Sequence, residues 1–159
     1  MALTTAQETT LAAHIKASTD PAVIAARTIR NDVELARLYN LTSTVDAWRS
    51  EMSGRDLFEA TDVTKFDGLT AGKRDAWRLL LNFAPCDMTR QKNRKAAVDV
   101  WGNTDAVAVL QACTRKATVA ESALGGNSAT TNTVTALKLN WEGSLSVDEV
   151  SYALNRNPV

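Results

Sequence analysis

The segment at residues 133–143, TVTALKLNWEG, decides the fold class because it breaks the helical pattern of the chain before it. Its side chains alternate between two faces, with Thr135, Leu137, Leu139 and Trp141 on one and Val134, Ala136 and Lys138 on the other. Such alternation, rich in Thr, Val and Trp, predicts a β-strand. A single strand is unstable by itself. Its partner is therefore either the segment at 42–51, TSTVDAWRSE, or a strand of another chain.

The chain around this strand carries helix start and stop signals. Thr5 with Glu8 matches a capping box, and so does Ser146 with Glu149. Gly102 is placed to end a helix. We expect helices at residues 5–17, 21–30, 32–40, 54–60, 71–83, 90–101, 105–124 and 147–155. We interpret residues 43–53, 61–69 and 125–133 as irregular connections or loops.

These signals predict a mainly α protein, a helical bundle with a small β element, a strand or a hairpin, near the C-terminus. The chain would divide into a helical domain at 1–125 and a second part at 126–159. That second part, a loop, a strand and a short helix, is expected to form a C-terminal extension or arm.

Composition narrows the classes of function. The 159 residues include 18 Lys or Arg and 18 Asp or Glu, and this balance disfavours a dedicated nucleic-acid binder. One histidine and two distant cysteines do not suit a zinc or other metal site. We find no apolar run long enough to span a bilayer and no secretory signal in MALTTAQETT, so we expect cytoplasmic assembly and no membrane partner.

The segment FDGLTAGKRDAW at 66–77 raises the question of a phosphate-binding loop. A Walker A loop needs G-x-x-x-x-G-K followed by Ser or Thr. Here the spacing from Gly68 to Gly72 is one residue short, Arg74 follows Lys73, and no hydrophobic strand precedes the glycines. We therefore interpret Gly68 as a turn and Thr70 as a helix N-cap.

No catalytic constellation stands out among the remaining residues. A nucleophilic cysteine needs a base, and His14 is the only imidazole available to Cys113 or Cys86. Buried, inert thiols and a histidine without a ligand role are the simpler interpretation. The carboxylates are scattered along the chain. We expect no enzyme activity, no cofactor and no metal.

Candidate interface residues fall in three places. The run RQKNRKAA at 90–97 is the densest basic stretch, and it is either a solvated helix face or a contact for a phosphate backbone or an acidic partner. A strand with a free edge can pair with another chain. The C-terminal NRNPV could dock as a tail. The candidates are Arg90, Lys92, Arg94, Lys95, Leu137, Leu139, Trp141, Arg156 and Pro158.

Several stretches together resemble a family of small virion proteins of tailed bacteriophages and prophages. They are MALTTAQ, AWRSEM with DLFEA, GLTAGKRDAWRLLL, CTRKATVAESAL and VTALKLNWEGSLSVDEVSYAL. The chain is most similar in layout to neck proteins of the head-to-tail adaptor (connector) type. The resemblance covers most of the chain, although no single motif in it is diagnostic.

The resemblance implies a mostly helical structural protein with no catalytic residue, located in the virion after assembly in the host cytoplasm. It implies a homo-oligomeric ring, typically dodecameric, that binds the portal and a tail or nozzle protein. Genomic DNA would pass through the lumen without sequence-specific binding. A terminal arm would reach the portal or a neighbouring subunit.

Other functions stay open from the sequence. The chain could be another neck or tail component, such as a tail completion or tail-attached protein, or a small monomeric enzyme or DNA-binding regulator. A helix-turn-helix at 89–124 is disfavoured because its second helix begins TDAVAVLQAC, which is acidic and apolar. Within the ring hypothesis we assign the basic run to a subunit interface, and we expect charge reversal of Arg94 and Lys95 to block assembly without unfolding the monomer.

Overall fold

The structure is a computed structural model that describes residues 2–82 and 85–156. It is an α/β fold, 59% helical and 17% strand, with a four-stranded mixed sheet. The prediction of a mainly α bundle with one small β element is therefore wrong. The missed strands are short and rich in Thr, Ser and Asn, so they carry little of the hydrophobic alternation by which strands are recognised.

The elements occur in the following order along the chain. They are α1 (Thr5–Ala17), α2 (Pro21–Thr28), α3 (Asp32–Tyr39), β1 (Thr42–Trp48), α4 (Gly54–Glu59), α5 (Val63–Gly68), α6 (Ala71–Asn82), α7 (Gln91–Ala112), β2 (Thr114–Thr118), α8 (Val119–Leu124), β3 (Gly126–Thr131), β4 (Val134–Leu139) and α9 (Val147–Arg156).

The predicted strand forms β4 and lies inside the sheet, whose order is β2-β1-β4-β3. Its partner is the segment that includes β1, which pairs with β4 in parallel so that Ala47 faces Leu137. On the other side β3 precedes β4 across a two-residue turn, where Asn132 takes a left-handed conformation with φ of 54°. Both edges of β4 are thus occupied within the chain, and the partner from another chain is not needed.

The chain divides into two compact units, each built from separate pieces of sequence. Unit 1 comprises Met1–Val45, Lys116–Asn127 and Leu139–Val159, and unit 2 comprises Asp46–Arg115 and Ser128–Lys138. The boundary between the units falls within each of the four strands. Residues 126–159 are therefore shared between the units, whereas the sequence predicted a separate extension.

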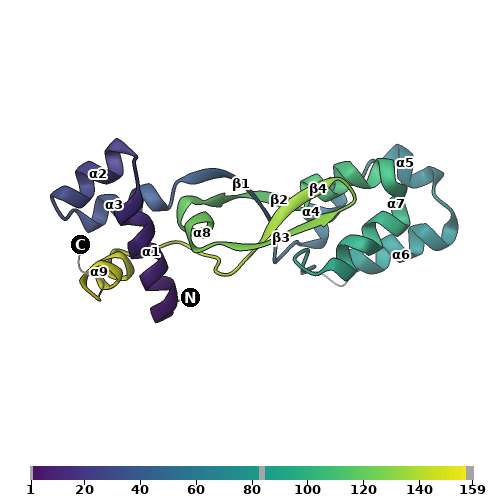
Figure 1. Ribbon diagram of the computed structural model, residues 1–159. Helices are drawn as coiled ribbons and strands as arrows, with labels where there is room; N and C mark the ends of the chain where they lie inside the picture. The colour runs from purple at the N-terminus through teal and green to yellow at the C-terminus, as the bar shows by residue number, and fades with distance from the viewer. Residues whose placement is uncertain (1, 83–84, 157–159) are drawn as a thin grey trace. The chain divides into compact units, whose positions relative to one another are not determined.

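Unit 1 is organised around α1, α3 and α9, which pack side by side (Figure 1). Thr4, not Thr5, caps α1, and it forms the capping box with Gln7 instead of Glu8. The capping box of α9 is confirmed, because the Ser146 and Glu149 side chains each bond to the other's backbone N–H. The buried core of this unit includes Leu11, Ile15, Val23, Leu35, Tyr39, Leu124, Trp141, Leu145 and Val150.

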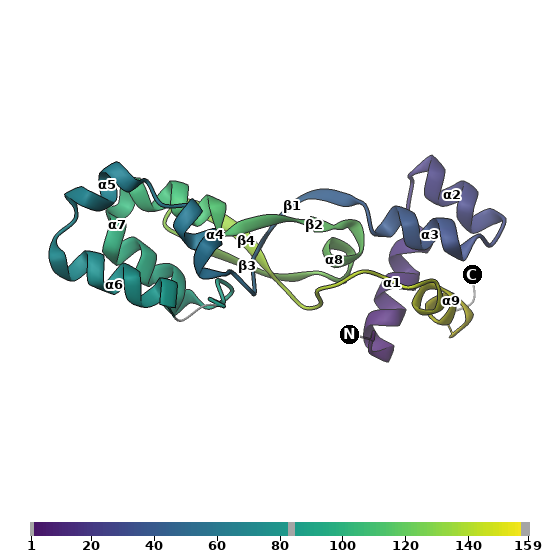
Figure 2. The same ribbon diagram turned by 180° about the vertical axis from the view of Figure 1, so that it is seen from behind.

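Unit 2 packs α4 and α7 against α6, as Figure 2 shows for α6 and α7. Trp77 and Trp101 meet edge to face with ring centroids 5.4 Å apart, and the Trp48 indole donates a 2.9 Å hydrogen bond to the Ala129 carbonyl. The predicted loop at 61–69 is instead helix α5, which Asp62 caps by accepting from the backbone N–H groups of Thr64 and Lys65.

The prediction of one long helix at 105–124 is also wrong. Helix α7 continues from Gln91 across a kink at Gly102, with φ of 76° and ψ of 167°, and ends at Ala112. The residues after it form β2 and then α8, because Thr118 opens a new helix through a capping box with Glu121. The predicted loop at 125–133 is replaced by β3 and its turn.

Candidate functional site

Arg94, the centre of the predicted basic face, is a core residue with only 3% of its surface exposed. Its Nε donates to the Thr131 hydroxyl at 2.8 Å and its Nη1 donates to the Met88 carbonyl at 2.7 Å. The guanidinium also lies over the Trp48 ring, 4.7 Å from its centroid. Burial lowers the pKa of Arg94, and the nearby Asp87 carboxylate opposes that effect. The side chain therefore joins α7 to β3 and is not presented to a partner.

The other three basic residues of the run are exposed. Arg90 donates a hydrogen bond to Asp87 at 3.0 Å. Burial alone would raise the pKa of Asp87, but the hydrogen bonds from Thr89 and Arg90 outweigh it, so the pKa is lowered. Within residues 2–82 and 85–156, Lys92 and Lys95 make no hydrogen bond or ion pair through their side chains. They lie three residues apart on α7 and so share one helix face. The surface that remains is the pair Lys92 and Lys95, which we call the lysine face.

The strand candidates lie mostly inside the chain. Trp141 is 3% exposed and belongs to the core of unit 1, and Leu139 is also buried. Leu137 is half-buried at the position paired with Ala47. The free strand edge on which their docking role depended is absent from the described structure, because β4 has a neighbour on each side.

At the C-terminus, Arg156 binds Glu8 of α1 at 2.7 Å, an ion pair that ties α9 to α1. Arg156 also lies over Tyr152, 5.9 Å from the ring centroid. Its side chain is therefore engaged within unit 1. Pro158 lies outside the described residues.

The segment once considered as a phosphate loop forms the end of α5 and the start of α6. Gly68 is the last residue of α5, so it continues the helix up to the link with α6 and does not form the predicted turn. Arg74 donates to the Asp67 carbonyl at 3.2 Å, which holds the link between the helices.

Neither cysteine is placed for nucleophilic chemistry. Both are free and buried. Burial raises the pKa of Cys113 to about 12, and it also raises the pKa of Cys86. Thiols in this state hold their protons and are poor nucleophiles. The interpretation of both as inert packing residues is consistent with this geometry.

A cavity of about 320 Å³ opens in unit 1 beside the only histidine. The His14 Nδ1 lies 2.7 Å from the Tyr39 hydroxyl, and the two rings meet edge to face. The rest of the lining is mostly aliphatic, with Ser18, Asp20, Val23, Leu38, Leu41, Thr42 and Val119. The sequence could not show this pairing, because His14 and Tyr39 lie on different helices, α1 and α3.

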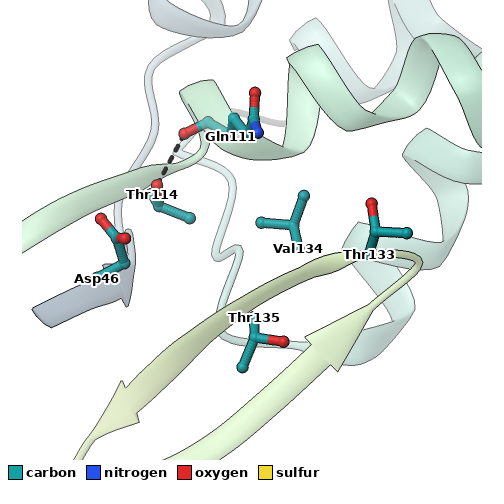
Figure 3. A pocket seen from close by; sticks show the side chains of 6 residues that line it. All are labelled: Asp46, Gln111, Thr114, Thr133, Val134 and Thr135. Carbon is teal, nitrogen blue, oxygen red and sulfur yellow. Dashed lines mark hydrogen bonds between the residues drawn. The ribbon is translucent and has the colours of Figure 1, made fainter.

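A second, polar pocket of about 190 Å³ lies in unit 2 (Figure 3). Its lining includes Asp46 of β1, Gln111 of α7 and three threonines, and the Thr114 hydroxyl donates to the Gln111 carbonyl at 2.8 Å. In the described part of the chain no three His, Cys, Asp or Glu residues are arranged to hold a metal ion. The same residues contain no helix that is both long and apolar enough to cross a membrane.

Large apolar side chains exposed to solvent are the surface feature that the sequence analysis missed. In unit 1 they include Ile29, Val33, Val147 and Tyr152, with 40–72% of their surface exposed. In unit 2 they are Phe58, Val63 and Leu79, each more than half exposed. Ile29, Phe58 and Val63 lie at or near the ends of short helices, where helical periodicity does not separate exposed residues from core residues.

Comparison of the chain with protein-family models, with curated proteins and with solved structures gives no significant match.

Proposed function

We propose that the chain is a structural subunit of a tailed-phage virion, a head-to-tail adaptor that forms a ring in the neck. In this role copies of the chain join the portal to the tail and leave a channel for DNA. The subunit contributes surfaces, not chemistry. The proposal rests on the sequence resemblance, and the observation that supports it best is the exposure of large apolar side chains on both units.

Exposed apolar side chains that lie close together mark partner contacts, whereas single ones are common on any protein surface. Ile29 at 72% exposure and Val33 at 64% flank the turn between α2 and α3. That turn is rigid, because Asn31 caps α3 at 3.0 Å and its own N–H binds the Ala26 carbonyl at 2.9 Å. A fixed loop that presents two aliphatic side chains loses little entropy on docking.

The second unit offers a matching kind of surface. Phe58 is the penultimate residue of α4 and Val63 begins α5, and both are more than half exposed. A subunit between two neighbours in a ring needs two different contact surfaces. Apolar residues exposed on both units support that requirement.

The mass of the purified protein, measured by light scattering alone and after addition of portal, tests the proposal. The expected result is a species that becomes a portal-bound ring of fixed stoichiometry. Ile29→Asp combined with Val33→Asp should reduce that assembly, whereas Ile24→Asp, at a less exposed position on α2, serves as the matched control. A chain that stays monomeric and ignores portal would contradict the proposal and return attention to the cavity beside His14.

A further inference from the structure

The two units carry opposite formal charge although the whole chain is neutral. Unit 1 has six Lys or Arg residues against eight Asp or Glu, a formal charge of −2. Unit 2 has twelve against ten, a formal charge of +2. Charge separated in this way favours contact between unit 1 of one copy and unit 2 of another, and it disfavours contact between like units.

Part of the unpaired positive charge of unit 2 lies on the lysine face. Lys92 and Lys95 are exposed and make no ion pair with any described residue. Lys92 lies in the first turn of α7, where the partial positive charge of the helix dipole adds to that of the two lysines. An approaching carboxylate would be attracted by all three charges.

Unit 1 presents a complementary face on the outer side of α9. Asp148 is exposed and, like the lysines, has no hydrogen bond or ion pair through its carboxylate within the described chain. Tyr152 lies one turn further on the same face with 58% exposure, and Val147 beside Asp148 is 40% exposed. The face therefore combines a carboxylate for a polar contact with Tyr152, an aromatic residue of the type that interfaces favour, and the Arg156 guanidinium lies over the ring of Tyr152.

We infer that the outer face of α9 in one copy docks on the lysine face of α7 in the next copy. This inference rests on the proposed ring, because a closed ring of more than two subunits requires unlike surfaces to meet head to tail. Asp148 pairs with Lys92 and Lys95 across the contact, and Tyr152 packs beside them. The opposite charge of the two units orients each new subunit as it joins.

Charge exchange between two variants tests this contact. One variant carries Lys92→Glu and Lys95→Glu, and the other carries Asp148→Lys. Each alone should assemble at least about tenfold more weakly than the wild type, because like charges then face each other. A mixture of the two should regain assembly, since the acidic α7 of the first meets the basic α9 of the second and the two alternate around the ring.

Matched controls are available on both units. Lys73→Glu changes an exposed, unpaired lysine on α6, and Ala13→Lys adds a positive charge at an exposed position of α1. Both should assemble like the wild type. Circular dichroism and urea unfolding would show that every variant is folded. The readout is the mass distribution with portal, measured by sedimentation velocity.

The outcomes separate this inference from the proposed function. If the wild type fails to assemble with portal, the adaptor proposal fails and the inference fails with it. If the wild type assembles and the reversed variants assemble equally well, only the inference fails. Loss of assembly in each variant without recovery in the mixture, or equal loss in the controls, would also overturn the pairing of α9 with α7.

Discussion

Arg94 belongs to a basic stretch of the sequence, yet its positively charged side chain is buried in the core of the protein. Its hydrogen bonds to Thr131 and to the Met88 carbonyl satisfy two acceptors that the fold removes from water. The Trp48 ring supplies a further attraction to the cation. The expected block of assembly by reversal of Arg94 is therefore an unsuitable test, because Arg94→Glu would bury a carboxylate against a carbonyl.

Arg94→Ala should lower the free energy of unfolding by about 2–4 kcal/mol, because it leaves the Met88 carbonyl unsatisfied and removes the packed stem of the side chain. Lys95→Ala, at the next residue, is exposed and should change that free energy by less than about 0.5 kcal/mol. Urea unfolding of both variants measures the difference. Equal midpoints would contradict the structural role of Arg94.

Ionisation of Tyr39 makes the free energy of unfolding depend on pH in the alkaline range. Burial raises the pKa of Tyr39 from 10.0 to about 12. The unfolded chain ionises first, so the free energy of unfolding should fall by about 2 kcal/mol as the pH rises from 10 towards 12. Tyr39→Phe should lose this part of the pH dependence.

Denaturant titrations at several alkaline pH values provide the measurement for Tyr39. At neutral pH the same substitution should cost about 1 kcal/mol, since the hydroxyl bond to His14 is lost. Parallel alkaline curves for the wild type and Tyr39→Phe would contradict the assignment.

At the scale of elements, the kink in α7 depends on one glycine. Gly102 combines φ of 76° with ψ of 167°, a conformation that residues with a Cβ avoid. A Cβ at this position would meet no atom within 4 Å, so the cost of substitution is conformational and not steric. The two segments of α7 meet at an angle that only this residue readily permits.

Gly102→Ala should therefore destabilise the protein by about 1–3 kcal/mol. Gly72→Ala is the matched control, because Gly72 lies within α6 with open space around its Cβ position, and it should stabilise by about 0.5–1 kcal/mol. Opposite shifts of the thermal midpoint would support the kink. Stabilisation by both substitutions would indicate that α7 is straight in solution.

Prediction from sequence succeeded where a local signal determines an element and failed where distant contacts do. The capping box of Ser146 with Glu149 and the interruption of the helix at Gly102 depend on local signals, and the structure confirms them. Strand β2 was read as helix because TRKAT carries no hydrophobic alternation and is recruited by its neighbour β1. The burial of Arg94 was missed because its partner Thr131 is 37 residues away.

Across the whole molecule, charge is balanced in total but divided between the units. If unlike units attract each other, the association should weaken with added salt, because ions screen exposed charges. Raising the salt from about 0.05 M to about 0.5 M should reduce the association constant roughly tenfold. Sedimentation velocity at several salt concentrations measures the effect. Unchanged or stronger association would indicate that the exposed apolar residues, and not the charges, hold the copies together.

The division of every strand between the two units has a consequence for the order in which the protein can fold during its synthesis. Helices α1 and α3 leave the ribosome before α8 and α9, with which they pack, and α9 is synthesised more than a hundred residues later. Unit 2 can close once Lys138 has emerged. Unit 1 is therefore begun first and completed last. Until α8 and α9 have been synthesised, the apolar faces of its early helices stay exposed, and chaperone binding or rapid completion of the chain protects them from aggregation.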